Sequence, residues 1–385
     1  MSFRRSDVPG EDIKLFMSMA DRRRQLIDES PATPINFDYG VNRLAKQLHP
    51  GIIKAKIVDK KDVGVGCQKI TLMSKSDDGT FPYFRAGQFI AVSSKVSDSF
   101  ITRPYSIASA PWMALAGLME IIVQKKGIFS SYLVDDLKMD DEVYVSEPAG
   151  DFYHDDIRDK GHVLAIAGGS GVTPFVSMMR AIMEGIEDYR LTLLYGVRTP
   201  EYMVIDPDDF KDDRIKIIPV VSEGEYEGYR HGFIDADLIE KYLDDDTSVF
   251  MCGPDSMYAH VRKQLEELGY PLEKVRQERN TIGNREVKEF KTCSLTVHIR
   301  DKVYDLEARN DETIMTAMER AGLAAPSRCR NGTCGFCHSR VISGQYHVST
   351  EDDFRRAADK KFNYIHPCCT YPESDMEIDV PYFEV

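Results

Sequence analysis

The stretch Cys329-Arg330-Asn331-Gly332-Thr333-Cys334-Gly335-Phe336-Cys337 places three thiols with four and then two residues between them, and Cys368 follows later. Five of the eight cysteines of the 385-residue chain fall between Cys329 and Cys369. Thiols clustered in this way in an intracellular chain are typical of a metal site rather than of disulfides. Gly332 and Gly335 lie where the loop has to curl its N–H groups toward the sulfurs, which glycine does at little cost. The stretch therefore predicts a metal centre with thiolate ligands.

Four thiolates suit either a zinc ion or an iron–sulfur cluster, and the spacing separates the two. Zinc ribbons pair two CxxC units, whereas Cx4Cx2C with a distant fourth cysteine is the plant-type ferredoxin arrangement. We therefore expect a 2Fe-2S cluster. Cys369 competes with Cys368 for the fourth position. Because Pro367–Pro372 resembles the ferredoxin pattern Cys-x-Thr-x-Pro in register with Cys368, we assign Cys368 and give no role to His338.

The sequence around this loop predicts a domain of its own. Leu295, Val297 and Ile299 alternate with polar residues, and the chain turns at Arg300-Asp301 into a second apolar run, which indicates a hairpin. A helix is expected over 311–322. We place this domain at 291–385, after a polar linker at 281–290.

Upstream of the linker, residues 157–280 have the pattern of an α/β nucleotide domain with a parallel sheet. The runs 162–167, 191–195 and 215–220 are apolar almost throughout, as strands covered on both faces are. The turn Gly168–Pro174 follows the first run and precedes a helical segment, which is the context that a dinucleotide pyrophosphate needs. A simple tight turn is the alternative interpretation. Two further strand ends, Tyr195–Arg198 and Met251–Pro254, favour the binding site, because such ends converge where open α/β sheets bind ligands.

Residues 51–156 carry about six short apolar runs separated by turns, which predict a small antiparallel β-barrel. One run ends in Arg103-Pro104-Tyr105-Ser106. A flavin needs an apolar surface for its ring, a cation for its phosphate and a hydroxyl or amide near N5, and this segment offers all three. An exposed arginine beside a core tyrosine is the alternative. Gly127 and Ser130 open a helix whose N-terminus can hold a phosphate, so we expect a flavin phosphate clamp with Arg103.

The first fifty residues form an N-terminal extension with helices expected over 11–30 and 41–48. They could serve as a docking arm or as a brace across the domains, and we favour the brace.

The overall composition excludes several classes of function. A net charge of −14 leaves no excess of lysine and arginine for phosphate, which disfavours nucleic acid and anionic membranes as partners. The chain has no apolar run long enough to cross a bilayer, and its first residues lack a secretory signal. We expect a cytoplasmic protein.

Six motifs occur in the same order and spacing as in the ferredoxin–NADP reductase superfamily, and the resemblance covers residues 51–385. The chain is most similar to the oxygenase-reductase type with a C-terminal ferredoxin, a group that includes phthalate dioxygenase reductase and ketosteroid hydroxylase reductase. The motifs are RPYS, GxxS, EPAGDF, GGxGxTP, YGxR and CGP, followed by the cysteine loop. This resemblance implies a β-grasp ferredoxin domain at the C-terminus.

The resemblance also implies roles for individual residues. Ser106 and Cys252 would border the site of hydride transfer. Together with the residues chosen from their own chemistry, the other residues expected to bind the flavin or the nicotinamide cofactor are Arg103, Pro104, Tyr105, Gly127, Ser130, Gly168, Gly169, Gly171, Thr173, Pro174, Arg198, Glu223, Gly253 and Pro254. The cluster ligands would be Cys329, Cys334, Cys337 and Cys368.

The expected function is therefore electron transfer from NAD(P)H through a flavin and the 2Fe-2S cluster to a partner protein such as an oxygenase component. We expect FAD, with FMN as the alternative. Glu223 stands where NADP-using relatives tend to carry arginine and would repel a 2′-phosphate, so we expect NADH rather than NADPH.

Two other functions fit parts of the pattern. One is a non-autonomous electron-transfer subunit, like that of dihydroorotate dehydrogenase, although such subunits lack a full ferredoxin domain. The other is a zinc-stabilised binding module.

Overall fold

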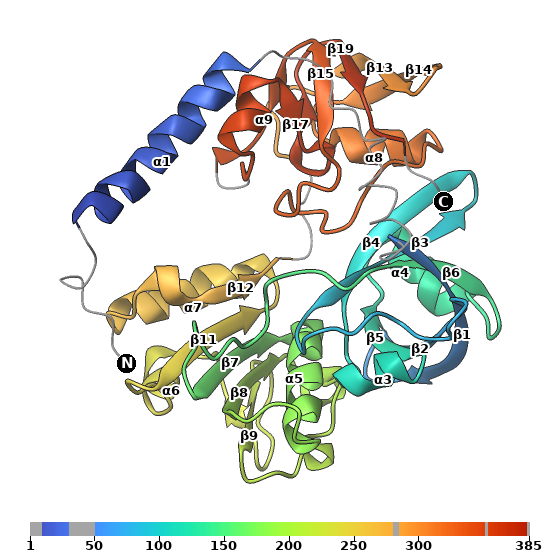
Figure 1. Ribbon diagram of the computed structural model, residues 1–385. Helices are drawn as coiled ribbons and strands as arrows, with labels where there is room; N and C mark the ends of the chain where they lie inside the picture. Colours follow the sequence, from blue (N-terminus) through green and yellow to red (C-terminus); the bar gives the residue numbers. More distant parts are fainter. Residues whose placement is uncertain (1–9, 31–50, 280–284, 351–352, 383–385) are drawn as a thin grey trace.

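The computed structural model describes residues 10–30, 51–279, 285–350 and 353–382. A barrel, a parallel-sheet domain and a small C-terminal domain follow one another along the chain (Figure 1). The expected helix over 41–48 lies outside the described residues. Among the helices that are described, none has the length and apolar character needed to cross a membrane.

Six antiparallel strands form the barrel in the order β4-β3-β6-β1-β2-β5. A bridge between Ile107, just after β4, and Ile121 of β5 joins the two edges of the sheet and closes it. The strands are β1 Ile52–Asp62, β2 Cys67–Ser74, β3 Phe89–Val96, β4 Ser99–Ser106, β5 Leu118–Gln124 and β6 Glu142–Ser146. The helices are α3 Pro111–Leu115 and α4 Ile128–Ser131, which continues as a π-helical turn, Tyr132–Asp136. The expected six-stranded antiparallel architecture is confirmed.

The nucleotide domain is a parallel sheet with the order β10-β9-β8-β7-β11-β12. Helix α5 covers one face, while α6 and α7 cover the other, which explains why the central strands are buried on both sides. The strands are β7 His162–Gly168, β8 Arg190–Val197, β9 Ile215–Val221, β10 Arg230–His231, β11 Thr247–Cys252 and β12 Arg276–Glu278. The α-helices are α5 Thr173–Met183, α6 Ala236–Glu240 and α7 Asp255–Glu267. Short 3-10 helices span Gly169–Val172, Pro200–Tyr202, Pro207–Asp209 and Leu272–Lys274.

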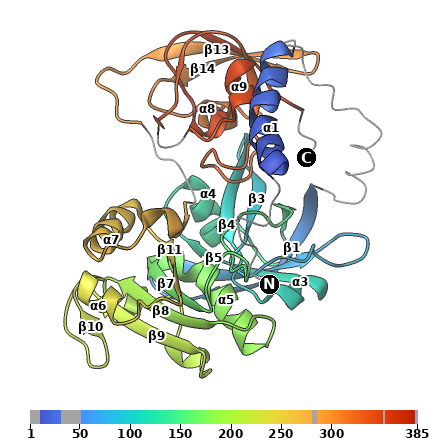
Figure 2. The same ribbon diagram turned by 60° about the vertical axis from the view of Figure 1, so that its left-hand side comes forward.

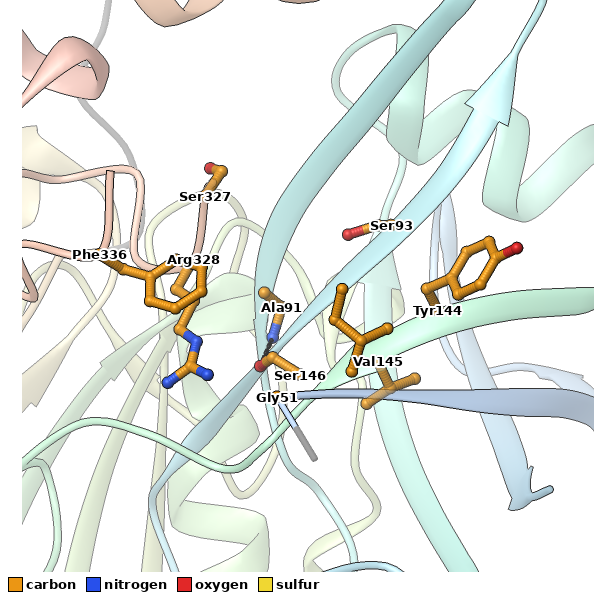
Figure 3. Close-up of a pocket in the computed structure, with 10 residues that line it drawn as sticks. Gly51, Ala91, Ser93, Tyr144, Val145, Ser146, Ser327, Arg328 and Phe336 are labelled. Carbon is orange, nitrogen blue, oxygen red and sulfur yellow. Dashed lines mark hydrogen bonds between the residues drawn. The ribbon is translucent and has the colours of Figure 1, made fainter. Parts of the chain in front are cut away.

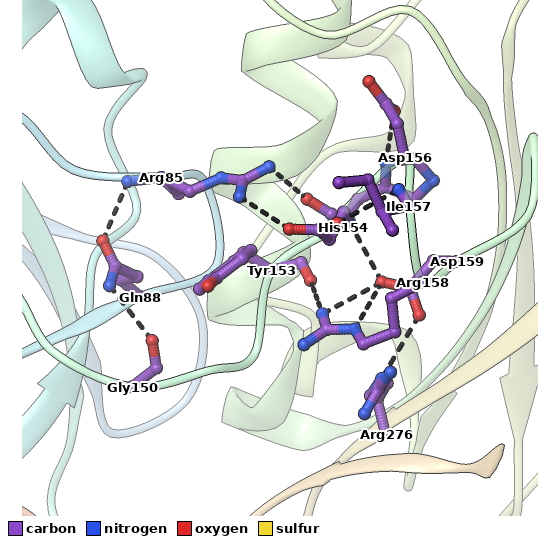
Figure 4. A network of polar contacts seen from close by, with 11 residues as sticks. Arg85, Gln88, Gly150, Tyr153, His154, Asp156, Ile157, Arg158, Asp159 and Arg276 are labelled. Carbon is purple, nitrogen blue, oxygen red and sulfur yellow. Dashed lines mark hydrogen bonds and ion pairs between the residues drawn. The ribbon is translucent and has the colours of Figure 1, made fainter. Parts of the chain in front are cut away.

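Barrel and nucleotide domain are joined by a polar network and a shared core. Figure 4 shows Arg85 of the barrel reaching the connecting segment, where its guanidinium contacts Asp155 at 3.1 Å. In the same segment Asp159 pairs with Arg158 at 2.9 Å and with Arg276 of β12 at 3.2 Å. Phe152 packs edge-on against two phenylalanine rings of the nucleotide domain. The connection therefore fixes how the two domains face each other.

The C-terminal domain is a five-stranded sheet with the order β14-β13-β19-β15-β17. Its central pair, β13 and β19, is parallel, and α8 packs on the sheet, as expected of a β-grasp domain. The strands are β13 Thr292–Ile299, β14 Lys302–Arg309, β15 Ser339–Ser343, β17 Tyr364–Ile365 and β19 Met376–Asp379, with a separate pair β16 Tyr346–His347 and β18 Tyr371–Pro372. The helices are α8 Ile314–Arg320, α9 Ala357–Lys361 and a 3-10 turn, Pro367–Cys369.

Helix α1, Gly10–Glu29, lies beside α9 of the C-terminal domain in both views (Figures 1 and 2). Asp28 and Lys361 approach to 4.0 Å. Leu15, Met19 and Leu26 are 65%, 60% and 57% exposed, so these three apolar side chains face solvent. The expectation of a brace across the domains gains no support from this packing.

Candidate redox site

The cysteine loop brings the four predicted ligands together. Cys337 and Cys368 have their sulfurs 3.5 Å apart, and the thiols of Cys329 and Cys334 contact each other. The backbone N–H of Cys334 points at the Cys329 sulfur from 3.5 Å. Cys334 is exposed, whereas the other three are buried. Cys329 also contacts Cys368, so the four sulfurs form one group, of which Cys334 lies at the surface.

The glycines of the loop have the conformations expected of them. Gly332 has φ +84° and Gly335 has φ +68°, both in the left-handed region that side chains disfavour. The carbonyl oxygen of Gly332 is also held by buried His366, whose Nδ1 lies 2.7 Å away. The two glycine conformations and the hydrogen bond from His366 determine the curl of the loop independently of a metal.

The four thiols form the ligand set of a plant-type cluster. A zinc ion needs four ligands around a single point, whereas a 2Fe-2S cluster distributes four thiolates over two irons. The sulfurs of Cys329, Cys334, Cys337 and Cys368 lie together, and their Cx4Cx2C spacing with a distant fourth cysteine fits the second case.

The geometry also bears on the choice between Cys368 and Cys369. The thiol of Cys369 lies 3.4 Å from the carbonyl oxygen of His366 and can donate to it. Cys368 is the residue whose sulfur lies at Cys337. The assignment of Cys368 stays a prediction, and this orientation supports it.

The flavin motif lies on β4, with alternating exposure. Arg103 and Tyr105 are half-buried, whereas Pro104 and Ser106 are buried, as the strand period predicts. Burial raises the pKa of Tyr105 above its ordinary value. Its ring lies 6.5 Å from that of Phe129 on α4, so β4 and α4 form neighbouring walls of one apolar surface.

The side chains of the predicted phosphate clamp, Ser130 and Arg103, have partners within the protein. The Ser130 hydroxyl accepts from the N–H groups of Lys126 and Gly127, each at 2.9 Å, and so caps its own helix. Arg103 has its Nη1 engaged by Glu319 of the C-terminal domain at 2.9 Å. Only the remaining N–H groups of Arg103 are left to meet a phosphate.

Ser106 ends β4 directly against the nucleotide sheet. Its hydroxyl donates to Oε2 of Glu278 over 3.3 Å, and Glu278 pairs with Cys252 across β12 and β11. Tyr258 joins the same group: its hydroxyl donates to the Glu278 carbonyl and accepts from the Gly253 N–H. A serine, a carboxyl and a thiol thus meet at the boundary between the two domains.

Burial determines the protonation of this group. It raises the pKa of Glu278 to about 8, opposed by the hydrogen bond from Ser106. Burial also raises the pKa of the Cys252 thiol well above its ordinary value, with the Glu278 carboxyl adding to the effect. Cys252 is therefore a neutral thiol, and Glu278 can hold a proton near neutral pH.

Sequence reasoning assigned no role to Glu278. It lies on a strand of three residues, too short for periodicity to reveal. The usable signal was its position at the end of the last strand of the domain, beside the strand that ends in Cys252.

A cavity of about 730 Å³ opens at the carboxyl edge of the nucleotide sheet. Five of the predicted residues line it: Gly168, Gly169, Arg198, Glu223 and Pro254. Ligands of open parallel sheets bind at this edge.

Three other predicted residues shape the turn beneath that cavity. A Cβ on Gly171 would lie 2.2 Å from the carbonyl oxygen of Cys252, so only glycine allows the turn to meet β11. The Thr173 hydroxyl donates to the Ser170 carbonyl at 2.7 Å, and Pro174 opens α5.

The cavity also presents residues that the sequence did not single out. Lys126 brings a cation from the barrel, and Phe233 brings a ring that is 69% exposed. His260 lies 5.9 Å from that ring. Arg198 and Glu223, which also line the cavity, form an exposed ion pair at 3.6 Å.

The comparisons with known proteins agree with the three parts of the fold. Residues 54–154 match the oxidoreductase FAD-binding domain, residues 165–263 the oxidoreductase NAD-binding domain, and residues 297–373 the 2Fe-2S iron–sulfur cluster binding domain. The resemblance drawn from the motifs, and with it the expectation of a flavin- and nicotinamide-dependent oxidoreductase, is confirmed.

Individual relatives span most of the chain. A subunit of the 1,2-phenylacetyl-CoA epoxidase of Escherichia coli K12 is 29% identical over 77% of this chain and 88% of its own length. The NADH oxidoreductase HCR of the same organism is 28% identical with the same coverage. Among solved structures, phthalate dioxygenase reductase has a TM-score of 0.62 at 24% identity, covering 86% of this chain and 98% of that one.

Proposed function

Because the chain joins an FAD-binding, an NAD-binding and a 2Fe-2S domain, we propose that it oxidises NADH and delivers single electrons to a partner protein. One observation carries the proposal. Strand β4 meets the nucleotide sheet through Ser106 and the C-terminal domain through Arg103, three residues earlier. A flavin bound along this strand would have the nicotinamide cofactor at the Ser106 end and the cluster at the Arg103 end.

The bound flavin supplies the exchange between the hydride of NADH, which carries two electrons, and the cluster, which takes one electron at a time. The chain's own residues prepare the boundary for this. Ser106 and Cys252 border it with small side chains, and the buried Glu278 carboxyl holds or releases a proton at Oε2.

The nicotinamide cofactor would lie in the 730 Å³ cavity. The N–H groups of the Gly168–Gly169 turn and the Lys126 cation suit a pyrophosphate. The ring of Phe233 offers a surface for adenine. Glu223 would accept from a ribose 2′-hydroxyl and repel a 2′-phosphate, which supports NADH, although the adjacent Arg198 weakens that discrimination.

The flavin is proposed to be FAD, as the matched domain model indicates, with FMN as the alternative. The partner is proposed to be an oxygenase component, since relatives of this length are named as part of an epoxidase and as a dioxygenase reductase. A cytoplasmic location is proposed because Cys67, Cys252 and Cys293, which lie outside the cluster loop, are free thiols, as reducing compartments keep them.

Chemical analysis of the purified protein tests the proposal. Iron and acid-labile sulfide in equal amounts, with one flavin per chain, are expected. Zinc in place of iron would reject an electron carrier in favour of a zinc-stabilised module. A tightly bound catalytic subunit carrying its own flavin would favour a non-autonomous electron-transfer subunit.

A further inference from the structure

Glu319 is a buried carboxylate of the C-terminal domain that contacts two other parts of the molecule. It lies on α8 and is 5% exposed. Its Oε1 accepts from the Thr102 N–H at 3.2 Å and from Nη1 of Arg103 at 2.9 Å, both on β4. The same oxygen lies 3.2 Å from Nη1 of Arg330. Glu319 therefore joins the flavin strand to the residue that follows the cluster ligand Cys329.

This contact holds only while the two domains are together. A buried carboxylate is costly unless it is paired and hydrogen-bonded, and its partners on β4 belong to the other domain. Separation of the domains would break the bonds from Thr102 and Arg103 together. The pairing thus favours one docked arrangement.

A second arginine of the cluster loop also packs against the barrel. Arg328, which precedes Cys329, stacks its guanidinium 4.0 Å from the ring of Phe336, and a Cβ on Gly51 at the start of the barrel would lie 3.6 Å from its Nη2. An arginine of the barrel therefore meets a glutamate of the C-terminal domain, and an arginine of that domain packs against the barrel. Figure 3 shows Arg328 and Phe336 directed toward barrel strands.

The backbones also approach closely at this interface. A Cβ on Gly322, just after α8, would lie 2.7 Å from the carbonyl oxygen of Asp98 in the β3–β4 turn. The cavity between the cluster loop and the barrel measures about 10 Å³, room for about one water molecule. The contact is a closely packed interface in which Glu319 forms ion pairs with Arg103 and Arg330.

We propose that Glu319 is a positioning residue for electron transfer: through Arg103 and Arg330 it holds the cluster loop against the flavin strand. The inference rests on the proposed function. Electron transfer slows steeply as the centres separate, so a small loss of docking lowers the rate at which the cluster is reduced. Reduction of the flavin by NADH takes place at the Ser106 end of β4 and does not require this docking.

The test compares Glu319→Gln with Glu307→Gln, which removes one exposed carboxylate from β14 of the same domain. Holoproteins of equal flavin and iron content are mixed with NADH without oxygen, and flavin and cluster absorbance are followed separately. Glu319→Gln is expected to slow cluster reduction about tenfold or more while flavin reduction keeps its rate. Hydrogen exchange should rise at β4 and at 327–337 in that variant, and in Glu307→Gln neither change should appear.

Glu319→Asp keeps the charge and should recover part of the rate. If Glu319→Gln loses flavin or iron on purification, Glu319→Asp carries the test, with an intermediate rate in support and a wild-type rate against. Cluster reduction at the wild-type rate in Glu319→Gln, or equal slowing in Glu307→Gln, overturns the inference. Failure of the wild-type cluster to be reduced at all would instead reject the proposed function.

Discussion

The Ser106 hydroxyl donates to the Glu278 carboxyl over 3.3 Å, across the boundary between the barrel and the nucleotide sheet. These residues are 172 positions apart in the chain, and both are buried. Their contact marks the point where the flavin strand meets the strand that runs beside Cys252.

The raised pKa of Glu278 predicts a pH-dependent stability. Burial lifts the pKa from 4.5 to about 8 in the folded protein, so between these values the folded state holds a proton that the unfolded state has lost. The unfolding free energy should therefore fall as pH rises through this window, by roughly 1.4 kcal/mol per pH unit at most. Glu278→Gln removes this contribution. Thermal melting from pH 5 to pH 8 should show the wild type losing stability relative to the variant; parallel curves would contradict the assignment.

Glu223 predicts the choice of nicotinamide cofactor. Glu223→Gln removes the charge that would repel a 2′-phosphate and frees Arg198 from its ion pair. The ratio of kcat/KM for NADPH to that for NADH should rise about tenfold, equivalent to roughly 1.4 kcal/mol. Glu225→Gln changes an exposed carboxylate two residues after Glu223. It is the control and should leave the ratio unchanged. A wild-type preference for NADPH would reverse the prediction.

The two adjacent cysteines should differ in their effect on the cluster. Cys368→Ser replaces a thiol that lies 3.5 Å from Cys337, and the visible absorbance of the cluster should be lost or strongly altered. In Cys369→Ser the hydroxyl can still donate to the His366 carbonyl, so the spectrum should persist. The reverse result would move the fourth ligand to Cys369.

The stability of the segment that connects the barrel to the nucleotide domain should depend on Asp159. Its side chain is 3% exposed and pairs with Arg158 and Arg276, so Asp159→Asn leaves two arginines without their carboxylate. Hydrogen bonds to charged groups contribute about 1.5–3 kcal/mol, and a loss of this order is expected. Asp156→Asn changes a side chain that is 96% exposed and serves as the control. Equal denaturation midpoints for the two variants would show that the network adds little to stability.

Local patterns predicted the local parts of this protein well. The spacing of Cys329, Cys334 and Cys337 indicated a curled loop, and alternation along 99–106 placed Arg103 and Tyr105 on one face. Apolar runs gave the parallel strands because both faces of that sheet are covered.

Contacts between distant parts of the chain could not be derived in this way. In the sequence, Arg103 had the features of a phosphate ligand and no other visible role. Its partner Glu319 lies 216 residues away, on a helix whose docking no local pattern reveals. Ser130 looked available to a ligand, although its hydroxyl bonds to the backbone three and four residues earlier. Glu278 stands on a strand too short to be recognised, and only the assembled sheet places it beside Cys252.

The central claim is that electrons pass along β4, from the Ser106 end to the Arg103 end. Rapid mixing of the wild-type holoprotein with NADH in the absence of oxygen tests it most directly. Flavin absorbance should fall first, and cluster absorbance should follow in a later phase at a rate independent of protein concentration. A flavin that is reduced while the cluster stays oxidised, or a cluster rate that scales with protein concentration, would contradict transfer within one chain.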